Sequence, residues 1–148
     1  MSEMTPNYQV CIAGTGSYLP EKILTNAELS IRVDTSDEWI VSRTGIKERR
    51  IAADSEFTSH MATHAARKAI EQAGLAAEDI ELIIVATITP DTPTPATACY
   101  VQHNLGASKA VAFDISAACS GVLYAMKITK RLISDGAFKN ALIIGAEK

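Results

Sequence analysis

Short apolar runs recur along the chain, separated by segments in which apolar and polar residues mix. The runs cover residues 8–13, 80–88, 109–116 and 140–148. They are rich in Val, Ile and Ala and do not alternate strictly with polar residues, which is the pattern of strands covered on both faces of a sheet. We therefore predict four strands, with 80–88 as a central one.

Between these runs, apolar residues fall at helical spacing. A stripe of alanine and isoleucine predicts a helix over 58–73 that ends at Gly74, and similar patterns predict helices over 96–105 and 119–135. The stretch TPDTPTPAT, with its three prolines, predicts a stiff loop without regular structure. The alternation of strands and helices predicts an α/β fold, in which helices flank a mostly parallel sheet.

The segment 25–52 contains two short helical signals. Thr35 and Glu38 have the spacing of a capping box, and Gly45 is placed to end the helix that follows. The motif RTGIKERR then places Arg43, Lys47 and two further arginines close together. This basic run is either a solvated face or a patch that binds an anion, such as a phosphorylated ligand or an acidic protein.

Trp39, the single tryptophan of the chain, lies in the same segment among charged residues. Its ring could be a core anchor, or it could form a flat surface on which a ligand ring stacks. Arg43 follows one helical turn later and is predicted to lie on the same face. The pattern alone leaves both roles open.

Composition and charge narrow the class of protein. The chain has 148 residues, of which 47% are hydrophobic and 21% charged, and this indicates one folded domain with a substantial core. A net charge of -3 gives no reason to expect a nucleic-acid partner. The start MSEMTPNYQV lacks the features of a signal peptide, and the apolar runs are too short to span a bilayer. We expect a cytoplasmic protein with no membrane partner.

Two stretches resemble binding motifs but lack essential residues. GTGSYL begins like a dinucleotide fingerprint, but Leu19 stands at the third glycine position and Pro20 follows it. His60 and His64 have the spacing of a zinc-protease helix, but Met61 stands where the glutamate would be. We predict neither a nucleotide cofactor nor a metal site, and we expect the two histidines to face solvent.

Cys119 is the candidate nucleophile. The other two cysteines, Cys11 and Cys99, lie in apolar patterns and are predicted to be buried structural residues. Cys119 instead lies where a strand gives way to a helix, among small residues. Free backbone N–H groups and the helix dipole at such a junction favour a thiolate and could stabilise an oxyanion. Local sequence leaves burial and reactivity equally open, because no histidine is placed by pattern to act as a base.

Several stretches together resemble one family. GTGSYLP, LTNAEL, VDTSDEWIVSRTGIKERRIA, AFDISAACSG and ALIIGAEK are similar to the N-terminal half of β-ketoacyl-acyl-carrier-protein synthase III. The resemblance covers nearly the whole chain and implies a thiolase-like fold. In that fold, two βαβαβαββ halves pack into a five-layered α-β-α-β-α body that dimerises, and residues 1–148 would be the first half.

The resemblance also implies roles for individual residues. Cys119 matches the nucleophile that takes an acyl group from acyl-CoA, typically acetyl, and passes it to malonyl-acyl carrier protein with loss of CO2. Trp39, Arg43 and Thr35 match residues that bind CoA. Both CoA and the carrier protein are substrates, and no further cofactor is implied. The catalytic histidine and asparagine of the family have no counterpart in this sequence, so we expect Cys119 to be both buried and reactive at a junction of two halves.

The resemblance leaves the substrate and the pathway open. Thr94 stands where many members have a phenylalanine that shortens the acyl pocket, which would leave room for a longer or branched acyl group. A relative on the same fold that makes a quinolone or polyketide would share these motifs. A further alternative is an inactive half that binds only CoA or a partner half.

Overall fold

The computed structural model describes residues 7–148, which divide into two compact units. Of the described residues, 7–18 and Phe57–Glu147 make up the sheet unit. The hairpin unit comprises Leu19–Glu56 and Lys148. Each unit has its own sheet, three-stranded in the sheet unit and two-stranded in the hairpin unit.

The sheet unit is built on parallel strands. These are β3 (Leu82–Ala86), β4 (Val111–Ile115) and β5 (Leu142–Gly145), in the spatial order β4-β3-β5. In register, Ile84 of β3 lies opposite Phe113 on one side and Ile143 on the other. The central strand β3 is buried along its whole length, because strands and helices surround it. The predictions of three of the strands and of a parallel sheet are confirmed.

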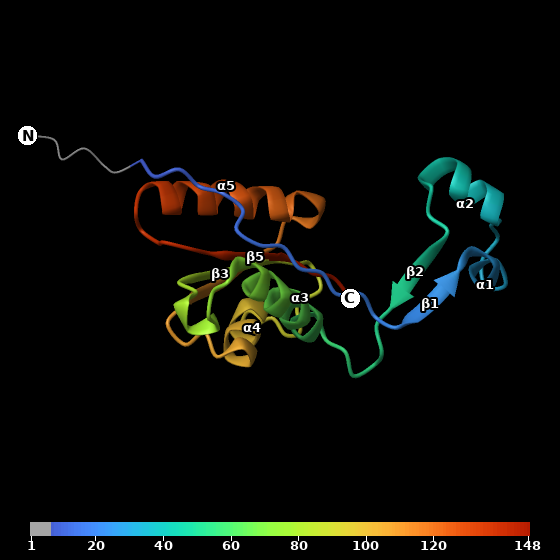
Figure 1. Ribbon diagram of the computed structural model, residues 1–148. Coiled ribbons are helices and arrows are strands. Elements are labelled where there is room, and N and C mark those ends of the chain that lie inside the picture. Colours follow the sequence, from blue (N-terminus) through green and yellow to red (C-terminus); the bar gives the residue numbers. More distant parts are fainter. Residues whose placement is uncertain (1–6) are drawn as a thin grey trace, which may run out of the picture. The chain divides into compact units, whose positions relative to one another are not determined.

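Helices cover both faces of this sheet. Helices α3 (Thr58–Ala73) and α4 (Thr97–Leu105) lie on one face, and α5 (Gly121–Ser134) lies on the other (Figure 1). Short 3₁₀ turns, Ala77–Asp79 and Ala118–Ser120, precede β3 and α5. The α/β class with helices flanking a parallel sheet is therefore confirmed.

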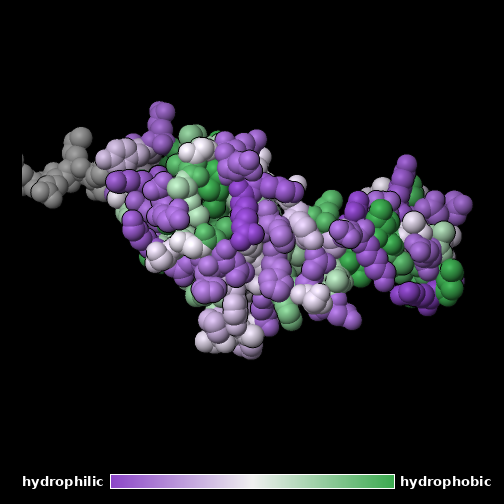
Figure 2. Space-filling view, turned by 60° about the horizontal axis from the view of Figure 1, so that its bottom comes forward, coloured by the Kyte–Doolittle hydropathy of each residue, from purple (hydrophilic) through white to green (hydrophobic). Residues whose placement is uncertain are grey.

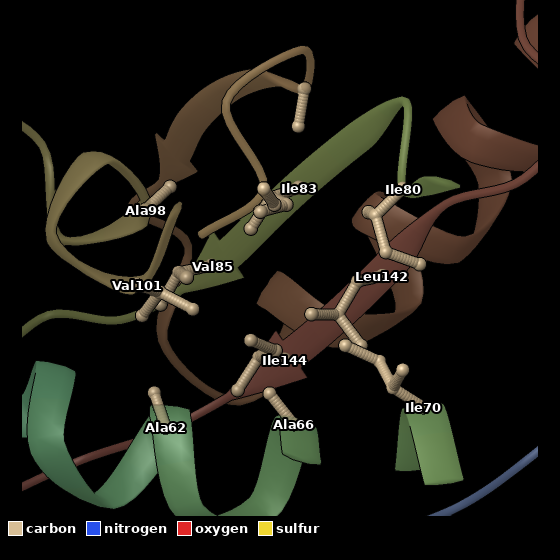
Figure 3. Close-up of a cluster of buried hydrophobic side chains, with 12 residues drawn as sticks. Ala62, Ala66, Ile70, Ile80, Ile83, Val85, Ala98, Val101, Leu142 and Ile144 are labelled. Carbon is tan, nitrogen blue, oxygen red and sulfur yellow. The ribbon is translucent and has the colours of Figure 1, made fainter. Parts of the chain in front are cut away.

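The main core lies between the sheet and helices α3 and α4. Ala62, Ala66 and Ile70 of α3 point toward Leu142 and Ile144 of β5 (Figure 3). The small alanine side chains let the helix lie close to the strand, as the sequence pattern indicates. The helix begins and ends at the predicted residues, and Gly74 follows it in the left-handed conformation, with φ 67°.

A carboxylate from the sheet caps helix α4. Residue Ala96 at the helix start has no side-chain acceptor, and Asp114 of β4 takes this role. Its two oxygens accept hydrogen bonds from the backbone N–H groups of Thr97 and Ala98, at 2.7 and 2.8 Å. The cap therefore fixes the start of α4 against β4.

The predicted strand over 8–13 is wrong. These residues form no regular element, and nearly the whole segment is exposed. The N–H of Tyr8 donates to the carbonyl of Ser134 at the end of α5, and Gly14 lies against the backbone of α3. A strand needs a neighbouring strand to complete its hydrogen bonds. This segment instead lies against helices α3 and α5, which offer no strand to pair with.

The hairpin unit carries two short helices on an antiparallel pair of strands. Strand β1 (Lys22–Thr25) pairs with β2 (Glu48–Ile51), and α1 (Asn26–Ser30) and α2 (Asp37–Thr44) lie between them in the chain. The two helices are confirmed, whereas the hairpin was not predicted, because the charged sequence of β2 resembles a basic surface run.

The predicted cap of α2 is one residue out. Ser36, rather than Thr35, precedes the helix, and its hydroxyl accepts a hydrogen bond from the N–H of Trp39 at 3.1 Å. The capping box of this unit lies at α1 instead, where Thr25 and Glu28 bind each other's backbone. Thr35 therefore does not serve as the helix cap.

Among residues 7–148, the helices are all too short or too polar to cross a membrane.

Candidate functional site

Cys119 lies in a strained turn at the carboxyl end of the parallel sheet. The 3₁₀ turn Ala118–Ser120 connects the end of β4 to α5, and Cys119 is its middle residue. Ala118 has a φ of 43°, in the left-handed region that residues with a Cβ rarely adopt. Backbone strain of this kind costs of order 1–3 kcal/mol and is concentrated at functional sites. The turn places Cys119 beside the positive end of the α5 dipole.

Glycines let the start of α5 lie directly on the strand ends. A Cβ built on Gly121 would lie 2.9 Å from the Cβ of Ala86, the last residue of β3. A Cβ on Gly145 of β5 would lie 2.6 Å from Cγ2 of Val122. The position of the turn that holds Cys119 is therefore set by close packing on β3 and β5.

The thiol of Cys119 is exposed in this chain. The predicted burial is at a junction with a second half of the fold, so it stays a prediction; within residues 7–148 the neighbouring face of α5 is open. Cys11 is also exposed and Cys99 is half-buried, so the prediction of two buried structural cysteines is wrong for Cys11 and only partly met for Cys99. Exposure leaves Cys119 accessible to a substrate.

The expected free N–H groups are partly engaged. The N–H of Ser120 donates to the carbonyl of Ala117 at 3.0 Å, and the N–H of Gly121 donates to the carbonyl of Ala118. These two N–H groups already donate hydrogen bonds within the turn, so they are not free to bind a substrate oxygen. The expectation of several free N–H groups around Cys119 is corrected to this extent.

The hairpin unit presents an exposed aromatic surface. The ring of Trp39 is 55% exposed, which excludes the core-anchor role within this chain. The guanidinium carbon of Arg43 lies 4.8 Å from the centre of the ring. The predicted placement of Arg43 on the same helical face is confirmed, and the pair forms a cationic and aromatic surface on α2.

A buried asparagine organises this unit. Asn26 is 1% exposed, and its amide nitrogen donates to Oδ1 of Asp37 at 2.7 Å and to the carbonyl of Ile46 at 2.8 Å. Its amide oxygen accepts from Arg49 at 2.8 Å. Because Asp37 begins α2, these bonds fix the helix that carries Trp39 and Arg43 onto the hairpin.

The basic motif therefore divides into structural and surface residues. Arg49 also donates to the carbonyl of Leu24, and Arg50 donates to the carbonyl of Pro20. Both guanidinium groups thus donate to backbone carbonyls in the hairpin unit. These two arginines have a structural role that neither predicted role of the basic run, a solvated face or an anion-binding patch, included. Arg43 alone among the three arginines lies over an aromatic ring.

The remaining predicted positions are Thr35 and the two histidines. The hydroxyl oxygen of Thr35 is buried and has no hydrogen-bond partner within residues 7–148. His60 and His64 are both exposed, as predicted. His64 stacks on Tyr18 with ring centres 4.8 Å apart, and Nδ1 of His60 accepts from the N–H of Phe57. The described residues contain no cluster of three or more metal-ligating side chains.

The predicted site residues fall into both units. Cys119 belongs to the sheet unit, whereas Trp39, Arg43 and Thr35 belong to the hairpin unit. The structure brings Trp39 and Arg43 together. Sequence reasoning missed Glu147, whose carboxylate lies at the same edge of the sheet as Cys119. Its signal in the sequence is an acidic residue near the end of the apolar run 140–148, two positions after β5 ends.

Comparison with known proteins finds similar sequences in one family. The sequence profile of 3-oxoacyl-[acyl-carrier-protein (ACP)] synthase III matches residues 113–148, the stretch that contains Cys119. A curated relative, the β-ketoacyl-[acyl-carrier-protein] synthase III of Caldanaerobacter subterraneus subsp. tengcongensis, is 60% identical over 136 residues. That match covers 92% of this chain and 41% of the relative.

Solved structures show the same fold. The 3-oxoacyl-[acyl-carrier-protein] synthase III of Aquifex aeolicus VF5 matches with a TM-score of 0.90 and 56% identity, covering 93% of this chain and 44% of that one. The priming β-ketosynthase of the R1128 polyketide pathway matches with a TM-score of 0.89 and 38% identity, covering 92% and 41%. The chain thus spans less than half the length of the relatives it matches.

Proposed function

We propose that this chain, a member of the β-ketoacyl-acyl-carrier-protein synthase III family, carries the nucleophile of a condensing enzyme that starts fatty-acid synthesis. The observation that carries the proposal is the position of Cys119. Its exposed thiol lies on a strained turn at the carboxyl edge of a parallel sheet, directly before α5. Ligands of open α/β sheets bind at this edge.

The proposed reaction has two steps. The sulfur of Cys119 attacks the carbonyl carbon of an acyl-CoA thioester, a carbon–sulfur bond forms, and CoA leaves as its thiol. Malonyl-acyl carrier protein then loses CO2, and the resulting carbanion attacks the acyl carbon. The bond to Cys119 breaks, and a 3-oxoacyl-acyl carrier protein is released. By the resemblance, a histidine and an asparagine outside these residues assist the second step.

The hairpin unit is proposed to bind the adenine end of CoA. Trp39 offers an exposed ring with Arg43 beside it, which suits stacking on a nucleobase and attraction to a phosphate. The buried and unpartnered hydroxyl of Thr35 is a further candidate contact. No resident metal or cofactor is required for this chemistry, because both substrates carry activated thioesters.

The exposed face of α5 supports a larger assembly. On α5, five apolar residues are at least 38% exposed, namely Val122, Leu123, Tyr124, Met126 and Ile128. An apolar face of this kind marks an interaction surface. Apolar residues also reach the surface on another side of the molecule, where Figure 2 shows green hydrophobic residues among purple hydrophilic ones. We propose that the remaining length found in the relatives packs on the face of α5, in a cytoplasmic homodimer.

The test is covalent labelling of the full-length protein. Incubation with acetyl-CoA, followed by proteolysis and mass spectrometry, is expected to place one acetyl group on the peptide that contains Cys119. Cys119→Ser should abolish the adduct, whereas Cys11→Ser, which removes another exposed thiol, should retain it. An adduct on Cys11 or Cys99 in place of Cys119 would disprove the assignment.

A condensing enzyme of secondary metabolism is the second candidate. Its support is the likeness to the priming β-ketosynthase of a polyketide pathway, at 38% identity, against 60% for the synthase III of Caldanaerobacter subterraneus. The two candidates differ in the acceptor and in the acyl group. Rates measured with malonyl-acyl carrier protein against other malonyl acceptors, each with acetyl and longer acyl-CoA donors, separate them.

A further inference from the structure

Glu147 binds the segment that extends central strand β3. Its carboxylate accepts a hydrogen bond from the hydroxyl of Thr89 at 2.6 Å and another from the hydroxyl of Thr87 at 3.2 Å. The N–H of Ile88 donates to both carboxylate oxygens, at 3.1 and 3.2 Å. One side chain that follows β5 therefore binds three consecutive residues that follow β3.

Two of these three residues are also bonded to other elements. The N–H of Thr87 donates to the carbonyl of Ile115, the last residue of β4, at 3.1 Å. The carbonyl of Thr89 accepts from the hydroxyl of Thr58, the first residue of α3, at 2.6 Å. Glu147 thus completes a polar network that joins the ends of all three strands of the sheet.

This network lies next to the turn that carries Cys119. Ile115 is four residues before Cys119, and Gly121, two residues after it, lies against Ala86, which directly precedes Thr87. The Thr87–Thr89 segment is therefore bonded to Ile115, three residues before the nucleophile turn, and it directly follows Ala86, which packs against Gly121, the first residue after the turn. A shift of this segment would therefore displace the strand ends on which the turn that carries Cys119 packs.

We propose that Glu147 is a positioning residue for Cys119, and this rests on the proposed function in which Cys119 accepts the acyl group. The carboxylate fixes the Thr87–Thr89 segment, and the segment in turn fixes the strained turn on the strand ends. A carboxylate is suited to this task because it only accepts hydrogen bonds and all its partners here are donors. Glutamine has the same shape but replaces one accepting oxygen with an NH2 group.

Glu81 provides a matched control at the opposite edge of the sheet. It directly precedes β3, and its Oε2 accepts a hydrogen bond from the N–H of Lys139, three residues before β5 begins, at 2.7 Å. Glu81 and Glu147 therefore link the same two strands, Glu81 at their amino ends and Glu147 at their carboxyl ends. Glu81→Gln makes the same chemical change in a side chain that links the same two strands, at the end of the sheet away from Cys119.

The experiment measures acylation and backbone protection in the full-length protein. Wild type, Glu147→Gln and Glu81→Gln are mixed with increasing acetyl-CoA, and the rate of acetylation at Cys119 is followed by mass spectrometry. We expect Glu147→Gln to lower the maximal rate by about tenfold, while the half-saturating concentration stays within about twofold of wild type. Glu81→Gln should leave both values unchanged.

Hydrogen exchange tests the positioning without any acyl donor. In Glu147→Gln, the amides of residues 87–89 and 116–121 should exchange at least about tenfold faster than in Glu81→Gln. Unchanged exchange at 116–121, or an equal fall in acylation for both variants, would overturn the role of Glu147. A wild-type protein that is never acetylated at Cys119 would overturn the proposed function instead, whatever the exchange shows.

Discussion

Gly121 and Ala86 approach each other so closely that a Cβ built on Gly121 would lie 2.9 Å from the Cβ of Ala86. Gly121→Ala therefore forces the first turn of α5 away from the end of β3. We expect this variant to lower the free energy of unfolding by about 1–3 kcal/mol, because overpacking outweighs the higher helix propensity of alanine. Urea denaturation followed by circular dichroism measures the change.

Gly145→Ala is the matched control for this prediction. Its new Cβ would meet Cγ2 of Val122, a methyl group of a partly exposed side chain that can turn away only by leaving the χ1 rotamer that valine prefers in helices. We expect a loss of no more than about 1 kcal/mol, the cost of a displaced rotamer. Equal losses in the two variants would mean that the contact with Ala86 does not determine the position of α5.

Asp114 should stabilise α4 through its two hydrogen bonds to the helix start. Asp114→Ala leaves the N–H groups of Thr97 and Ala98 without their acceptor, and we expect the free energy of unfolding to fall by about 1–2 kcal/mol. Asp114→Asn keeps one accepting oxygen and should lose about half as much. Thermal denaturation of the three proteins at one pH checks the order, and an asparagine variant less stable than the alanine variant would contradict it.

Glu28 should make the start of α1 sensitive to acid. Hydrogen bonds from the backbone N–H of Thr25 and then from its hydroxyl lower the pKa of Glu28 below its ordinary value. Because the pKa is lower in the folded state, the stabilisation is present above the unfolded-state pKa and is lost as the pH falls through the folded-state pKa. The amide resonance of Thr25 should therefore titrate below about pH 4.3.

Glu28→Gln provides the control for this titration. Glutamine has no proton to gain in this range, so the acid-dependent shift of the Thr25 resonance should disappear while α1 persists at neutral pH. A midpoint at or above the ordinary glutamate value in the wild-type protein would contradict the prediction, and so would an unchanged shift in the variant.

Local signals predicted much of the fold. The helix over 58–73 begins and ends at the predicted residues, because its alanine stripe and Gly74 act within one segment. The strands around 80–88, 109–116 and 140–148 also formed where continuous apolar runs indicated them. The segment 8–13 has similar composition but forms no strand, since pairing depends on a neighbour that the segment itself does not specify.

The candidate site was predictable only in part, because some of its features depend on neighbouring elements that a local pattern does not specify. The approach of Arg43 to Trp39 follows from helical spacing, so the sequence was sufficient. The positive φ of Ala118 and the bonds of Glu147 depend on how α5 and three strand ends meet. The exposure of Cys119 depends on what covers α5, which no local pattern specifies.

Trp39 should contribute to CoA affinity without contributing to stability. Its ring is 55% exposed, so Trp39→Ala removes little buried surface, but it removes the stacking surface beside Arg43. We expect the Kd for CoA, measured by calorimetry on the full-length protein, to rise by roughly 5- to 100-fold, as for the loss of one base-stacking aromatic residue. Ile31→Ala, an 84% exposed apolar residue in the same unit, should leave the Kd unchanged. If both variants weaken CoA binding equally, Trp39 acts only through general surface hydrophobicity, and the stacking role is wrong.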